Sequence, residues 1–299
     1  MYYLDKVRKV PEKSFLIMKT GDFMKPLKKN RQGQYKIPSG YCLRVNMTSD
    51  TFLEEADEWR EDMWRIIKSR PDVRFYILTK RVPRIQAHLP KNWGEGYENV
   101  ELNITCENQR AFDERWPIFE KIPAKHKGMN LAPLLGPIDI TPALASGQIE
   151  SVCLGGEGFG GRRPCHYEWI KDLHDQCEKY RVNFTVNSIG AVFIKDGKTY
   201  IMERQDIQGR QAYLSDLSLF YKKPEFRLFD PRDGHRLSED ELMKPVYNLE
   251  RCSMCTSFET CIGCVDCGSC KNIRFAEYKE VFEARERWKA RRQSSRSGC

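Results

Sequence analysis

The chain has 299 residues and a mass of 35.1 kDa, which is enough for one large domain or two modest ones. Apolar residues make up 40% and charged residues 31%, as in soluble globular proteins. No apolar run approaches the roughly 18 residues of a membrane helix, and no signal-peptide pattern opens the chain. These features exclude membrane-spanning and secreted proteins and favour a cytoplasmic location. The net charge of +8 is compatible with an anionic partner without identifying one.

Short runs of strand-forming residues alternate with helical stretches along the first two thirds of the chain. Seven runs begin near Phe15, Tyr41, Val73, Val100, Gly128, Glu150 and Val182. Their spacing is that of repeated strand–helix units, which predicts an α/β fold with a parallel sheet and a functional edge at the carboxyl ends of its strands. Seven strands are one fewer than a closed eight-stranded barrel needs. The count does not separate a partial barrel from a doubly wound sheet.

Two of the intervening helices have clear sequence signals. In residues 51–69, steps of four and three place on one face Phe52, Ala56, Trp59, Met63 and Ile66, and Thr51 with Glu54 matches a capping box. Residues 166–181 show the same periodicity, which places Cys177 on a buried helix face. Both segments are therefore predicted to be amphipathic helices.

We expect four regions in the chain. Residues 1–194 form the barrel-like domain, and the polar, turn-rich residues 195–250 form a strand-and-loop extension. Residues 251–272 form a cysteine-rich metal-binding segment, and residues 273–299 form a charged helix and tail.

Half of the twelve cysteines cluster near the C-terminus, at Cys252, Cys255, Cys261, Cys264, Cys267 and Cys270. A Cys-x2-Cys turn lets two thiolates reach one metal, and repeating it completes a tetrahedral set. In a chain without a secretion signal, such spacing indicates metal binding rather than disulfides. Six thiolates exceed one mononuclear site, so either four of them ligate or a cluster shares them. The dense repeats favour an iron–sulfur cluster, with zinc as the alternative.

A glycine-rich segment follows the sixth strand-forming run. Gly156, Gly158 and Gly161 match G-x-G-x-x-G, whose backbone amides can bind a phosphate. An active-site loop carrying Arg162 and Arg163 and a purely structural loop are the alternatives. Polar residues also follow several other strands, at Asn46–Asp50, Thr79–Arg81, Cys106–Asn108, Glu157 and Asn187–Ser188. Together they favour a site at this edge of the sheet.

Five ordered stretches carry a family resemblance: VNMTSDTF (45–52), FYILTKRVPRI (75–85), VELNITCENQRAFDERWPIF (100–119), LAPLLGPIDI (131–140) and LGGEGFGGRRPCHYEWIKDLHDQCEKYRVNFTVNSIG (154–190). With them, the chain resembles a phage-associated, radical-SAM-like family of unknown function over about residues 1–240. The resemblance implies a partial or complete (β/α) barrel of radical S-adenosylmethionine type. It also implies that Asp50, Asn108, Gly155, Gly156 and Glu157 line the cofactor crevice.

In that family a three-cysteine loop near the N-terminus holds a 4Fe–4S cluster, and this chain has no such loop between Met1 and Arg251. Either the loop lies upstream of an internal Met1, which we expect, or this member has lost its radical cluster. The resemblance therefore implies a radical enzyme with an auxiliary iron–sulfur site. Its substrate is unknown, and a flavodoxin or ferredoxin is the expected electron donor.

A second interpretation is a zinc-containing nucleic-acid-binding protein of phage or mobile-element origin. Residues 271–299 carry nine Lys or Arg and four Glu, interleaved with Phe275, Tyr278 and Trp288. A solvated charged helix is the simpler explanation of that pattern.

Overall fold

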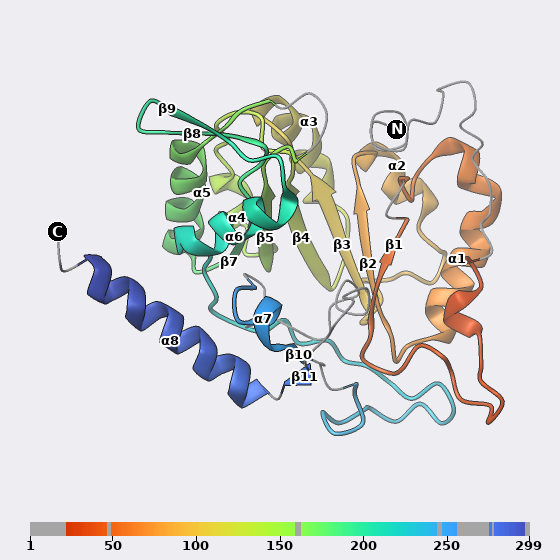
Figure 1. Ribbon diagram of the computed structural model, residues 1–299. Coiled ribbons are helices and arrows are strands. Elements are labelled where there is room, and N and C mark those ends of the chain that lie inside the picture. Colours follow the sequence, from red (N-terminus) through yellow and green to blue (C-terminus); the bar gives the residue numbers. More distant parts are fainter. Residues whose placement is uncertain are drawn as a thin grey trace.

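The computed structural model describes residues 22–46, 49–158, 163–243, 247–255, 275–276 and 278–296. At its centre lies a six-stranded, wholly parallel sheet (Figure 1). Its strands, in spatial order, are β1 (Cys42–Val45), β2 (Arg74–Thr79), β3 (Val100–Thr105), β4 (His126–Leu131), β5 (Ser151–Gly155) and β7 (Asn183–Ser188).

The strands follow one another across the sheet in chain order, which is the order of a curled half-barrel and not of a doubly wound sheet. The predicted parallel α/β fold is thus confirmed, and six of the seven predicted strands are present. The run that begins at Phe15 lies outside the described residues. The described strands do not close into a barrel.

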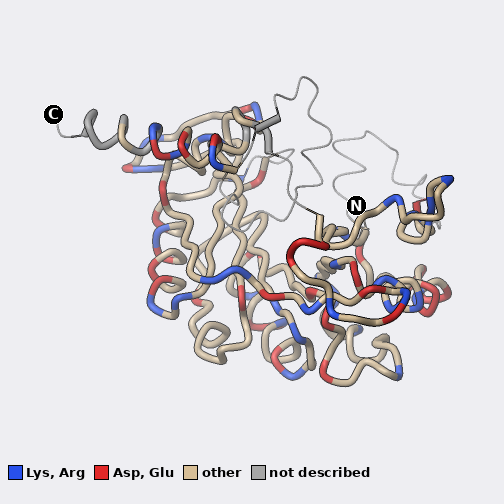
Figure 2. Tube along the Cα trace, turned by 90° about the horizontal axis from the view of Figure 1, so that it is seen from below, with Lys and Arg blue, Asp and Glu red and all other residues tan. Residues whose placement is uncertain are grey.

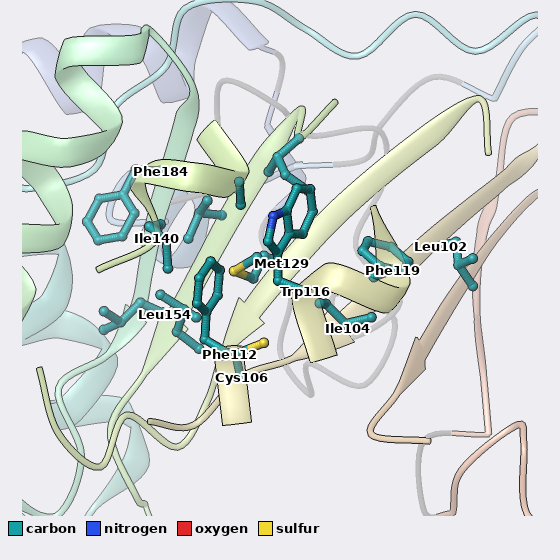
Figure 3. Close-up of a cluster of buried hydrophobic side chains, with 14 of the residues drawn as sticks. Leu102, Ile104, Cys106, Phe112, Trp116, Phe119, Met129, Ile140, Leu154 and Phe184 are labelled. Atoms are coloured by element: carbon teal, nitrogen blue, oxygen red, sulfur yellow. The ribbon is translucent and has the colours of Figure 1, made fainter. Parts of the chain in front are cut away.

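Helices cover the outer face of the sheet. They are α1 (Asp57–Ser69), α2 (Val82–Ile85), α3 (Gln109–Phe119), α4 (Thr141–Ala145) and α5 (Tyr167–Tyr180), with single 3-10 turns at Lys25–Leu27, Glu54–Ala56 and Gln86–His88. Figure 3 shows Phe112, Trp116 and Phe119 of α3 against Ile104 and Met129 of the sheet. Each fully buried aromatic or aliphatic side chain in this layer contributes about 1.5–3 kcal/mol by its removal from water.

The first predicted helix begins later than its periodicity indicates. A 3-10 turn occupies Glu54–Ala56, α1 begins at Asp57, and no described side chain caps it, so the capping box prediction is wrong. The buried face is also shifted, because Arg60 points inward and donates hydrogen bonds to the carbonyls of Thr51 and Leu53. The helix predicted over 166–181 is confirmed as α5, and its Cys177 is fully buried.

A second, three-stranded sheet lies beside the C-terminal part of the half-barrel. It contains β6 (Cys165–His166), β8 (Val192–Lys195) and β9 (Lys198–Ile201), with β8 and β9 joined through Asp196 and Gly197, both at positive φ. Such a two-residue turn matches the twist of a hairpin. Helix α6 (Gln205–Ser215) follows and packs against β7.

Residues 217–243, which we call the strap, then cross beneath the amino ends of the strands (Figure 1). Leu219 pairs with Phe184 of β7, Phe229 N donates to Pro71 O (3.2 Å), and Met243 N donates to Ser39 O (2.8 Å). The strap therefore runs from the last strand of the sheet back to the first.

The described residues of the C-terminal part form β10 (Tyr247–Asn248), α7 (Leu249–Cys252), β11 (Phe275–Ala276) and α8 (Tyr278–Arg296). Strands β10 and β11 pair antiparallel. Among the described helices, none is both long enough and apolar enough to cross a membrane.

Candidate functional site

The carboxyl ends of β1 and β2 are joined through Asp50. Its carboxylate accepts hydrogen bonds from the Thr79 hydroxyl (2.7 Å), the Lys80 amide (2.9 Å) and the Phe52 amide (2.9 Å). Arg81 adds an ion pair at 3.5 Å. Asp50 thus lies at the predicted edge of the sheet, where it holds two strand ends together.

The residues after β3 also have structural partners. Asn108 is the N-cap of α3, because its side-chain oxygen accepts a hydrogen bond from the Ala111 amide at 2.9 Å. Burial raises the pKa of Glu107, but hydrogen bonding from Arg115 (2.7 Å) and the charge of Lys80 outweigh it, so the carboxyl pKa lies below its ordinary value. Burial raises the pKa of the Cys106 thiol to about 12, which leaves it protonated and a poor nucleophile.

Gly156 and Glu157 pack tightly against the chain that follows β7, whereas Gly155 lies beside Ala132. A Cβ on Gly156 would lie 2.5 Å from the carbonyl oxygen of Ile189, and its amide donates to Ser188 O at 2.9 Å. Glycine is therefore required at position 156 for close packing of two backbones. Residues 159–162 lie outside the described residues, so the predicted phosphate loop stays a prediction.

The Glu157 carboxylate is 8% exposed and faces Arg163, which donates from its guanidinium (2.6 Å) and its backbone amide (2.8 Å). Burial raises the pKa of Glu157, but these hydrogen bonds prevail and hold it below the ordinary value. Glu157 is thus a buried carboxylate at the carboxyl end of β5, charged at neutral pH.

The inner face of the sheet is polar. Strand alternation and register place on it the side chains of Arg44, Tyr76, Glu101, Asn103, Asn130, Cys153, Thr185 and Asn187. The opposite, outer positions of the same strands hold the apolar core. Sequence reasoning missed this face, although the alternation of Glu101, Asn103 and Thr105 with Val100, Leu102 and Ile104 was available as a signal.

Near its centre, the inner face carries neutral hydrogen-bonding groups. Burial raises the pKa of Tyr76 well above its ordinary range and that of Cys153 to about 11, so both are protonated at neutral pH. The Asn187 amide donates to the Cys153 sulfur at 2.8 Å. The neighbouring Asn130 side chain partly offsets the rise in the pKa of Tyr76. The Asn130 Oδ1 is buried and accepts no hydrogen bond from the described part of the chain. A buried acceptor without a partner is costly, and a ligand N–H or O–H would remove that cost.

Below this centre lies a buried charged pair. Arg74 and Glu101 approach to 3.4 Å, and burial raises the pKa of Glu101 in spite of the arginine. The Phe226 ring of the strap covers Arg74, whose guanidinium carbon lies 3.7 Å from the ring centroid. The strap thus closes the inner face at the amino ends of the strands, while the edge with Asp50 and Glu157 lies at their opposite ends.

A family described as a protein of unknown function, DUF5131, matches residues 7–235. The chain belongs to this family. The match includes the whole half-barrel, both glycines before Glu157 and most of the strap, and it ends before the cysteine-rich segment. No curated protein and no solved structure matches the chain significantly.

The cysteine-rich segment is described only at its beginning, beyond the part that matches DUF5131. Cys252 is the last residue of α7 and is buried, and the Cys255 amide donates to Cys252 O at 3.1 Å. This hydrogen bond closes a tight turn between the two cysteines, as a shared metal ligand pair requires. Cys261, Cys264, Cys267 and Cys270 lie outside the described residues, so ligation by all six cysteines stays a prediction.

Proposed function

We propose that this DUF5131 member is a radical S-adenosylmethionine-type protein whose half-barrel binds that cofactor between its inner face and the carboxyl edge of its strands. The polar inner face of a parallel half-barrel is the observation that carries the proposal. The resemblance of the sequence to a radical-SAM-like family supports the same function. The reaction and its substrate stay open.

The hydrogen-bond acceptors on the inner face and at the carboxyl edge suit S-adenosylmethionine. Its adenine amino group and its ammonium group are N–H donors, and the buried Asn130 Oδ1 is an acceptor with no donor in the described part of the chain. The charged Glu157 carboxylate can attract the ammonium group. The hydrogen bond from Arg163 holds that carboxylate in place. When bound beside a reduced iron–sulfur cluster, this cofactor supplies radical chemistry.

The chain's own contribution is to bind, orient and shield the ligand. Tyr76 and Cys153 remain protonated at neutral pH, so neither introduces a charge beside the ligand. The Phe226 ring lies over Arg74 at the far end of the inner face, where it covers the charged pair that Arg74 forms with Glu101.

Equilibrium dialysis with radiolabelled S-adenosylmethionine tests the binding step without requiring turnover. The wild-type chain is expected to bind, and Asn130→Ala is expected to weaken binding about 5- to 100-fold, as loss of a buried hydrogen bond does. Glu58→Gln, on the exposed side of α1, is the matched control and is expected to bind like wild type. Absence of binding by the wild-type chain, or equal binding by Asn130→Ala, contradicts the proposal.

We further propose that the cysteines from Cys252 to Cys270 hold an auxiliary iron–sulfur cluster, with zinc as the alternative metal. Six thiols at Cys-x2-Cys spacing and the tight turn from Cys252 to Cys255 support it. Anaerobic purification should give stoichiometric iron and sulfide and an absorption band near roughly 400 nm from thiolate-bound iron. Zinc without iron would select the alternative, and a flavodoxin or ferredoxin would then have no cluster to reduce at these cysteines.

A nucleic-acid partner is the second candidate, and an aromatic pair on α8 favours it. Tyr278 and Phe282 are 49% and 42% exposed, and their rings stack with centroids 6.1 Å apart. Exposed rings on a basic segment can stack with bases. Figure 2, however, shows Lys and Arg interleaved with Asp and Glu over the described chain, α8 included.

Fluorescence anisotropy with a labelled single-stranded oligonucleotide tests this candidate. Binding that weakens steeply with salt, and that falls about 5-fold or more in Tyr278→Ala/Phe282→Ala, would support it. Binding that is unchanged in that double variant would exclude the aromatic pair as the binding surface.

A further inference from the structure

The two ends of the cysteine-rich segment meet at one place in the fold. Strand β10 pairs with β11, with Tyr247 opposite Ala276 and Asn248 opposite Phe275. Helix α7 leads directly from β10 to Cys252, and α8 follows β11. The chain therefore leaves this ladder toward the cysteines and returns to it, so the ladder already provides the loop closure that a metal would otherwise have to impose.

Arg285 of α8 reaches across this closure to the first cysteine turn. Its side chain is buried, and its Nη1 donates to the carbonyl oxygens of Cys252 (3.2 Å), Ser253 (3.3 Å) and Cys255 (2.8 Å). Three carbonyls within four residues thus converge on a single guanidinium nitrogen. Together with the 3.1 Å hydrogen bond from Cys255 N to Cys252 O, they fix the backbone of both cysteines.

The same side chain joins this turn to the half-barrel. The Arg285 guanidinium carbon lies 5.2 Å from the centroid of the Tyr213 ring in α6, and Val281, one helical turn earlier in α8, is fully buried. In turn, Gln208 of α6 contacts Ser188 at the carboxyl end of β7 at 3.2 Å. Arg285 therefore lies where α6, α8 and the cysteine turn meet.

We propose that Arg285 is a positioning residue for the metal centre, holding Cys252 and Cys255 in the turn from which both act as ligands of that centre. This inference rests on the proposed metal centre of the cysteine-rich segment. A ligand pair that is ordered before metal arrives loses less conformational entropy on binding. A thiolate-bound metal centre, whether M²⁺(Cys⁻)₄ or a 4Fe–4S cluster, also carries a net negative charge, which a neighbouring guanidinium stabilises.

Cobalt(II) titration of the apo full-length chain tests the inference, because cobalt–thiolate coordination has its own visible absorption and needs no activity assay. Arg285→Gln is expected to weaken cobalt binding about 10- to 100-fold, as loss of a residue that orients a metal ligand does. Arg285→Lys keeps the positive charge but not the planar guanidinium. We therefore expect a cobalt affinity between those of wild type and Arg285→Gln. Arg287→Gln is the matched control, because Arg287 lies on the same helix, is 62% exposed and pairs with Glu283 at 3.8 Å; its affinity should equal that of wild type.

The outcomes separate this inference from the proposal on which it rests. Circular dichroism establishes that each variant retains the half-barrel, and a folded Arg285→Gln chain with wild-type cobalt affinity overturns the role of Arg285 while leaving the metal centre intact. If Cys252→Ser/Cys255→Ser binds cobalt, zinc and iron as wild type does, these two thiols are not ligands. That result overturns both the role of Arg285 and ligation by the first two cysteines.

Discussion

Asp50 and Thr79 are hydrogen-bonded at 2.7 Å across the carboxyl ends of β1 and β2, although 29 residues separate them in the chain. The other Asp50 contacts, to the amides of Phe52 and Lys80, make this carboxylate the common acceptor for two strand ends. The resemblance assigned Asp50 to a cofactor crevice, and the structure shows that it also has a structural role at that edge.

Replacing Asp50 should therefore destabilise the fold. Asp50→Ala leaves the Thr79 hydroxyl and two backbone amides without their acceptor, and we expect a loss of about 1.5–3 kcal/mol in the free energy of unfolding. Urea denaturation measures it, with Glu58→Gln on the exposed side of α1 as the control. An Asp50→Ala chain as stable as that control would show that solvent replaces these hydrogen bonds.

Gly128 provides a second test, of the inner face. A Cβ at this position would lie 2.0 Å from Asn103 Oδ1, which is far inside contact distance. We expect Gly128→Ala to cost about 1–3 kcal/mol of stability through overpacking. Adding Asn103→Ala should recover part of that cost, because it removes the clashing atoms, and a double-mutant cycle measures the coupling. Additive effects of the two substitutions would mean that Asn103 moves aside without cost.

The anchoring of the strap depends on Phe226. Its ring stacks on His126 with centroids 3.8 Å apart and lies 3.7 Å from the Arg74 guanidinium carbon. Phe226→Ala should cost about 1–3 kcal/mol through lost aromatic and cation–π contacts and should expose the strap to proteases. Limited proteolysis with mass spectrometry locates the cleavage. Phe220→Ala, at a ring that is 44% exposed, should leave the cleavage pattern unchanged.

The parallel α/β sheet was predictable because its strands and helices recur at a nearly constant spacing, and spacing survives even where a strand is weakly hydrophobic. Spacing alone did not separate a half-barrel from a doubly wound sheet. The run at Val100 contains Glu101 and Asn103, yet it forms a central strand. Those same polar residues mark the inner face, which sequence reasoning missed because each run was taken as a whole and not as two alternating faces.

Other features depend on contacts between distant residues, which no local pattern reports. The buried face of α1 was predicted only in part, because Ile66 is buried as expected but Arg60 is buried too, where its charge is satisfied by backbone carbonyls of the preceding turn. The course of the strap depends on its pairing with Phe184, Pro71 and Ser39. Asn108 illustrates a further difficulty, since a polar residue at a strand end serves equally as a helix cap or as a ligand contact.

The stability of the strap near His235 should depend on pH. The imidazole approaches Asp233 Oδ1 at 2.6 Å through Nδ1 and Glu241 Oε1 at 3.0 Å through Nε2. Hydrogen bonds from the Ser238 amide, His235 and the Ser238 hydroxyl lower the pKa of Glu241 from 4.5 to about 2, and those with Asp233 and Glu241 raise the pKa of His235 above 6.5.

These two shifts have opposite consequences for stability. The charged Glu241 stabilises the strap fully above pH 4.5, and this contribution is lost as the pH falls toward 2. The protonated His235 stabilises it fully below pH 6.5, and this contribution is lost as the pH rises through the raised pKa of the folded state. Local stability should therefore be greatest between pH 4.5 and 6.5.

Hydrogen exchange of residues 229–243, corrected for the intrinsic effect of pH, measures this local stability. His235→Asn should remove the loss of protection on the alkaline side, whereas Glu239→Gln, at an exposed neighbouring position, should retain it. Equal pH profiles for wild type and His235→Asn would show that the imidazole does not hold this part of the strap.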